Sequence, residues 1–200
     1  MIDLGERGEG HAAFGSYFGG RAISDPIAMD VMLDGLCAAG RVRGEAIVAA
    51  THYIPGNQNG VLRVTRLIAE GRAEPRFVER QLLGGGWMKS LTGDQLHELL
   101  SAIAGRNLEY AAFVIDFLAM WVHSGKPIEG ALRELAWRCF ESAPQEGEAW
   151  DYDLVASALA PEDLPRAFAL FELLLTLPSD RKSWEPLDRH GGNRFWNTLW

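Results

Sequence analysis

The sequence predicts an all-α protein made of antiparallel helix pairs, stacked as an α-solenoid or arranged as an irregular helical bundle. From Ser24 onward, apolar residues recur with a period near 3.6, the period of a helix with one buried face. Short turns of glycine and proline separate these stretches. Alternating β-branched runs, which would indicate strands, are missing from the sequence. We therefore expect roughly 60% helix or more, against about a third in an average globular protein.

Three segments are expected along the chain. Residues 1–23 form an N-terminal arm rich in glycine and aromatic residues, and its glycines disfavour a long helix because each costs about 1 kcal/mol relative to alanine. Residues 24–178 form a helical, repeat-like domain, and residues 179–200 form a loop and an aromatic helix. Because the sequence stops on an apolar helical face, either that helix packs back onto the domain or the chain is a piece of a larger multidomain protein, and we expect the latter. The excess of arginine over lysine, together with many alanines and glycines, is typical of GC-rich bacterial genes and favours a bacterial protein.

The first helix of the domain is predicted to run from Pro26 to Gly40. Asp25 is a favoured capping residue, and proline is favoured in the first helical turn. The apolar residues expected on its inward face are Ile27, Val31, Leu33 and Leu36.

Three more helices are expected before residue 87. They run from Glu45 to Tyr53, from Asn59 to Glu70, and from Pro75 to the triple glycine at 84–86. Five arginines lie between residues 60 and 80, and we interpret them as a solvated helix surface. They are Arg63, Arg66, Arg72, Arg76 and Arg80.

In the second half, a helix capped at residues 92–94 should end at Gly105 and bury four apolar residues. These are Leu96, Leu99, Leu100 and Ile103. Asn107 is expected to cap the longest helix, which is apolar on nearly all sides and therefore predicted to be central and buried. The expected bounds of this and the remaining helices are 108–123, 127–140, 151 or 153 to 159, and 161–177.

A faint internal offset favours repetition. Asp25, Asp94 and Asp163 stand 69 positions apart at expected helix starts, and Gly60 and Gly130 stand 70 apart. Two helical hairpins of about 35 residues each would give this spacing. With its Asp25-Pro26 start, its paired helices at 92–105 and 108–123, and its helix at 161–177, the chain resembles the HEAT/armadillo-like α-solenoid class over residues 24–177. That resemblance implies a binding surface rather than a reaction.

Composition excludes several functions. A net charge of −8 argues against nonspecific nucleic-acid binding, which needs a basic face. Cys37 and Cys139 lack the paired spacing of a metal or redox motif, so buried, reduced thiols in a cytoplasmic protein are expected. The sequence has no apolar run of about 20 residues for a membrane span, and no signal-peptide pattern.

The sequence contains no strong motif for metal binding, phosphate binding or catalysis. The five histidines are scattered without a paired i, i+4 arrangement, so no zinc site is expected. The glycine clusters at 5–10 and 84–86 are not followed by a lysine at the spacing of a phosphate-binding loop, since Lys89 is out of register, and neither cluster follows a strand. The acidic stretch 141–153 lacks the calcium-loop pattern. We assign no catalytic, cofactor-binding or metal-binding residue, and expect no cofactor.

Two functions remain open at this point. The first is a noncatalytic helical scaffold or protein-interaction region, whose partners are other proteins or further domains of the same polypeptide. The alternative is a small all-helical enzyme or ligand-binding domain with a pocket between helices. Asp116 matters most for it, because a carboxylate in an apolar helix is costly unless it is paired. The residues considered for that pocket are Arg106, Glu109, Tyr110, Asp116 and His123.

The chain is rich in tryptophan, with seven in 200 residues. Trp121 and Trp137 fall on helical stripes and are expected in the core, whereas the tryptophans near the C-terminus are candidates for contact with a partner. The C-terminal helix is also a candidate for self-association. The predicted interaction residues are Trp184, Phe195, Trp196 and Trp200.

Overall fold

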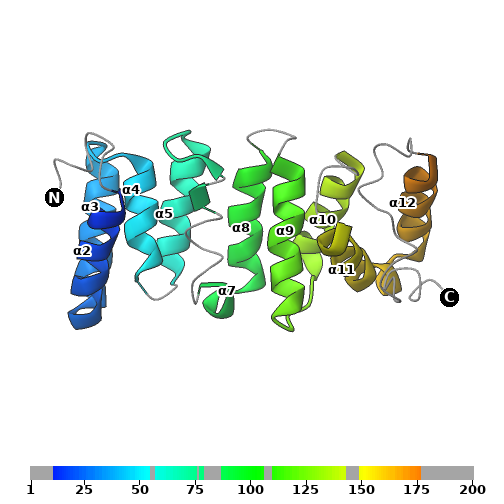
Figure 1. The fold of residues 1–200 in the computed structure, drawn as a ribbon, viewed down its shortest axis with the longest axis horizontal. Coiled ribbons are helices and arrows are strands. Elements are labelled where there is room, and N and C mark those ends of the chain that lie inside the picture. The colour runs from blue at the N-terminus through cyan, green and yellow to red at the C-terminus, as the bar shows by residue number, and fades with distance from the viewer. Residues whose placement is uncertain are drawn as a thin grey trace. The chain divides into compact units, whose positions relative to one another are not determined.

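The computed structural model of the chain is all-α, as predicted (Figure 1). It describes residues 11–54, 57–75, 77–78, 87–105, 110–142 and 149–176. About 82% of the described residues are helical, and none of them lies in a strand. The expected helix content is therefore confirmed. No described helix is both long enough and apolar enough to cross a membrane.

The chain divides into two compact units, residues 1–106 and 107–200. The first unit contains six described helices, which Figure 1 shows from blue to green. They are α2 (His11–Ser24), α3 (Pro26–Ala39), α4 (Gly44–His52), α5 (Gln58–Ala69), α7 (Trp87–Ser90) and α8 (Gly93–Ala104). The expected segment boundaries at 23/24 and 178/179 stay predictions.

Helix α2 corrects the expectation that glycine keeps the N-terminal segment from forming a long helix. The helix extends over 14 residues and packs against α4. A Cβ at Gly15 would lie 2.9 Å from Tyr53 Cε2, and one at Gly19 would lie 2.8 Å from Tyr53 Cγ. The glycines therefore permit a close approach of α2 to α4, and the packing gained there offsets their low helix propensity.

Helix α3 has the predicted ends but a different inward face. The Asp25 carboxylate accepts the Ala28 N–H at 2.9 Å, and Gly40 closes the helix in the left-handed conformation. The prediction that Ile27 and Val31 face the core is wrong, because both are exposed. Leu33 is buried as expected and Leu36 is half-buried. The buried residues of α3 are Met29, Asp30, Leu33 and Cys37.

Helices α4 and α5 are close to their predicted bounds. Asn57 caps α5 by accepting the Gly60 N–H at 2.7 Å. Gly44 opens α4 where the chain after α5 passes over it, and a Cβ there would lie 2.0 Å from the Arg72 carbonyl oxygen. This position therefore excludes any side chain. In the stretch predicted to continue to residue 86, Pro75, Phe77 and Val78 are helical, and the residues that follow lie outside the described part.

Helix α8 confirms its prediction in detail. Thr92 and Gln95 form a capping box, in which the Thr92 hydroxyl accepts the Gln95 N–H and the Gln95 side chain accepts the Thr92 N–H. The four predicted apolar residues are all fully buried, and α8 packs against α5. The one-turn helix α7 that precedes it was not expected.

The second unit is arranged around α9, which packs against both α10 and α11. Its elements are α9 (Tyr110–His123), α10 (Gly130–Ser142), α11 (Ala149–Leu159), the 3₁₀ turn η1 (Ala160–Glu162) and α12 (Leu164–Thr176). The prediction of a buried central helix is confirmed for α9, and its expected cap Asn107 lies outside the described residues. Trp121 and Trp137 lie in the core, as predicted.

The residues that suggested a repeat have different structural roles. Asp25 and Asp163 each accept a backbone N–H at the start of a helix, but Thr92 caps α8 and Asp94 only lies in its first turn. Gly60 is buried inside α5, whereas Gly130 begins α10 with a φ of +53°. Asp163 also follows a 3₁₀ turn that holds Pro161, so α12 begins three residues later than predicted. The HEAT/armadillo-like resemblance stays a prediction.

Candidate functional site

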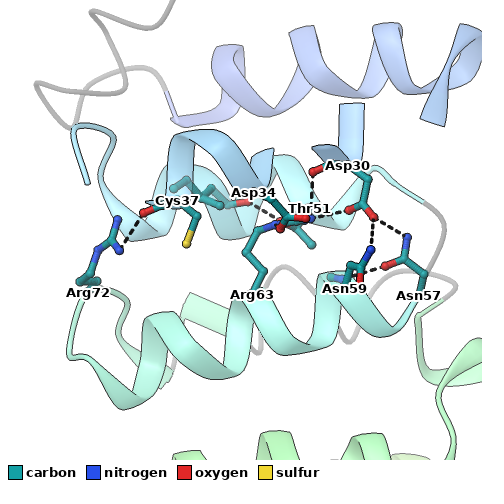
Figure 2. A network of polar contacts seen from close by, with 10 residues as sticks. Asp30, Asp34, Cys37, Thr51, Asn57, Asn59, Arg63 and Arg72 are labelled. Carbon is teal, nitrogen blue, oxygen red and sulfur yellow. Dashed lines mark hydrogen bonds and ion pairs between the residues drawn. The ribbon is translucent and has the colours of Figure 1, made fainter. Parts of the chain in front are cut away.

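Arg63 is a buried cation that joins three helices of the first unit. Its side chain leaves α5 and is only 1% exposed (Figure 2). Nε donates to Asp34 Oδ1 at 2.8 Å, and Nη1 donates to Thr51 Oγ1 at 3.1 Å. Nη2 donates to the Asp30 carbonyl oxygen at 3.1 Å and pairs with the Asp30 carboxylate. One guanidinium therefore links α5 to α3 and α4.

The second oxygen of the Asp30 carboxylate is bound from the start of α5. Asn57 Nδ2 donates to Asp30 Oδ2 at 3.1 Å, and Asn59 Nδ2 approaches the same atom at 3.5 Å (Figure 2). The Thr51 hydroxyl in turn donates a hydrogen bond to the Ile47 carbonyl oxygen at 2.8 Å. We call these six residues the Arg63 clamp: Asp30, Asp34, Thr51, Asn57, Asn59 and Arg63.

The clamp is built to hold helices together. A buried charge is tolerated when it is paired and hydrogen-bonded, and Arg63 makes four such contacts. Its carboxylate partners are engaged by Arg63 itself and by the two asparagines. The network thus fixes the positions of α3, α4 and α5 relative to one another.

The arginine-rich stretch is only partly the solvated surface that was expected. Arg66 is exposed, but Arg63 is buried and Arg72 is half-buried. Arg72 Nη1 donates to the Cys37 carbonyl oxygen at 3.0 Å and so completes the last turn of α3. The side chains of Arg76 and Arg80 lie outside the described part.

The clamp determines which side of α3 faces outward. Because Asp30 faces inward together with Met29, Leu33 and Cys37, the remaining side of α3 points away from the core. Ile27 is 77% exposed and Val31 is 67% exposed, and Ile23 at the end of α2 is 88% exposed. We call these three residues the aliphatic patch: Ile23, Ile27 and Val31.

The ion pairs described in the second unit involve exposed carboxylates. Arg166 on α12 contacts both carboxylate oxygens of Glu134 at 3.1 and 2.9 Å, lies 3.5 Å from Glu141, and stands over the Trp137 ring. Its hydrogen bond with Glu134 raises the pKa of the guanidinium. Arg133 pairs with Glu162 in the same region. Such exposed pairs contribute at most about 1 kcal/mol each.

The histidines and cysteines whose side chains are described do not converge on a site. His52 is half-buried against Tyr53, and burial lowers its pKa, while His97 meets Ser101 at 3.2 Å and His123 is exposed. Within the described ranges, no group of three or more potential ligands could hold a metal ion. Cys37 and Cys139 are free and buried, and burial raises the pKa of the Cys139 thiol to about 11.

The described candidate residues of the enzyme alternative are spread along α9. Tyr110 and His123 are the two ends of α9, about 20 Å apart at 1.5 Å per residue. Asp116, between them, is half-buried, and Arg106 and Glu109 lie outside the described residues. The structure therefore does not bring the described members of this set together. The predicted interaction residues Trp184, Phe195, Trp196 and Trp200 also lie outside the described part.

The aliphatic patch was not predicted, because Ile27 and Val31 were expected on the inward face of their helix and Ile23 was placed in the N-terminal arm. A signal was present in Asp30 and Arg63, two opposite charges that each occupy an inward position on an apolar helix. Comparison with known proteins adds no assignment: no family model, no curated protein and no solved structure matches the chain.

Proposed function

We propose that the chain is a noncatalytic α-helical scaffold or protein-interaction region, and that it binds its partner through the aliphatic patch. The observation that carries this proposal is the exposure of Ile23, Ile27 and Val31, at 88, 77 and 67%. Single exposed aliphatic residues are common on protein surfaces, but neighbouring ones form the apolar patches that mark interaction sites.

The clamp beneath the patch supports the proposal. Burying Ile27 and Val31 would contribute about 1.5–3 kcal/mol each. The fold instead buries Asp30 and Arg63, a pair that well-packed apolar residues could replace with little or no loss. A partner that covers the patch would gain the free energy of burying Ile27 and Val31, which folding of the single chain does not provide.

A photo-reactive amino acid in place of Ile27 tests this function in cells that naturally express the chain. The matched control carries the same group in place of Leu62, which is 41% exposed on α5. We expect a covalent protein adduct, identified by mass spectrometry, from position 27 and little from position 62. An interaction role for the patch is excluded if position 27 yields no protein adduct, or the same adducts as position 62.

A further inference from the structure

We propose that the aliphatic patch is the contact surface of a symmetric homodimer, in which α3 of one copy packs antiparallel against α3 of a second copy. The inference rests on the proposed function and names its partner. It is independent of the C-terminal helix, for which self-association was also predicted.

The outward side of α3 is complementary to itself. Ile27, Val31 and Gly35 are each four residues apart, so they lie on one side of the helix, one turn from the next. If a two-fold axis passes at Val31, Val31 meets its own copy and Ile27 faces Gly35 of the other chain. The space beside Gly35 is open, with no atom within 4 Å of an added Cβ. A large side chain thus meets a gap on both sides of the axis, as an isologous contact requires.

Charge also favours a second copy of this chain. The protein carries a net charge of −8, so most faces of two copies repel each other. The exposed side of α3 is uncharged except for Asp34, which is held by Arg63 Nε at 2.8 Å. By contrast, the exposed residues of α5 include Arg66. Antiparallel packing also places the positive start of one α3 beside the negative end of the other.

The area that the patch can bury determines how tightly two copies should bind. The three aliphatic side chains supply roughly a third of the ~800 Å² that each partner buries in a standard interface. Ala28 and Ala38, which are exposed on the same helix, extend the surface. We therefore expect a weak, reversible dimer that dissociates at concentrations on the order of 1–100 µM.

The test uses sedimentation velocity of the full chain over that concentration range. Val31→Glu and Val31→Lys each place two like charges across the proposed axis, so each variant alone should stay monomeric. An equimolar mixture of the two should form dimers again, because unlike charges then meet. Val31 is exposed, so neither change should alter the far-UV circular dichroism spectrum. Gly35→Leu, which fills the gap that receives Ile27, provides a second variant and should weaken the dimer at least tenfold.

The matched controls are Leu62→Glu and Leu62→Lys, which should dimerise like the parent chain. A parent chain that is monomeric at all concentrations would overturn the homodimer, as would a dimer that the position 31 variants leave unchanged. Failure of the mixture to dimerise would also reject the two-fold axis at Val31. If the parent is monomeric but photo-crosslinking at position 27 captures a different protein, the homodimer is wrong and the interaction function stands.

Discussion

The two units use arginine in opposite ways. In the first, Arg63 is buried and its contacts join α5 to α3 and α4. In the second, Arg166 lies at the surface and joins α12 to α10 through solvated carboxylates. A buried charge must be satisfied in one geometry, whereas a solvated charge has water as an alternative partner. The difference indicates that charge pairing specifies helix orientation in the first unit and adds only modest stability in the second.

Removing the guanidinium from each unit should show the largest contrast. We expect Arg63→Met to lower the free energy of unfolding of the first unit by about 3–5 kcal/mol, because Asp30 is left buried without its cation. Arg166→Met should cost at most about 1 kcal/mol. Hydrogen exchange followed by mass spectrometry can measure both, with peptides from α5 and α12 as reporters. Equal losses in the two units would remove the contrast.

Two adjacent glycines of α2, Gly19 and Gly20, test whether this helix packs closely against α4. Gly19→Ala should destabilise by about 1–3 kcal/mol, because the new methyl group would collide with the Tyr53 ring near its attachment to the backbone. Gly20→Ala has open space and should stabilise by about 0.5–1 kcal/mol. Urea unfolding monitored by circular dichroism separates the two. If both variants are stabilised, α2 does not pack closely on α4.

The smallest expected effect is the part of the stability loss at acidic pH that His52 causes. Burial lowers the pKa of His52, so below pH 6.5 the unfolded chain takes up a proton that the folded chain resists. This contribution to stability is therefore present above pH 6.5 and is lost as the pH falls below it. We expect the loss of thermal stability between pH 7 and pH 5 to be smaller in His52→Gln than in the parent chain. An identical loss in both would show that His52 does not contribute.

Much of the fold could be predicted from the sequence, because capping residues and turn glycines act locally. Asp25 and Thr92 each accept a backbone N–H three residues later, so their patterns indicated helix starts correctly. The inward face of α8 was correct because it carries only apolar residues.

The orientation of α3 could not be predicted in this way. It depends on Asp30 pairing with Arg63, which lies 33 residues later and was assigned to a solvated surface. The helical character of α2 likewise depends on Tyr53, a partner far from Gly19 in sequence. Both errors arose where a tertiary contact outweighs the intrinsic preference of a residue. The aliphatic patch was missed for the same reason, since Ile27 and Val31 are exposed because the buried face of α3 is the one that holds Asp30.

A double-mutant cycle between Asp30 and Arg63 tests most directly whether the buried pair orients α3. The free energy of unfolding of the first unit is measured for Asp30→Asn, Arg63→Met and the double variant, beside a control cycle of Glu134→Gln and Arg166→Met in the second unit. We expect a coupling energy of about 2–3 kcal/mol for the buried pair and at most about 0.5 kcal/mol for the exposed pair. A coupling near zero between Asp30 and Arg63 would contradict the account.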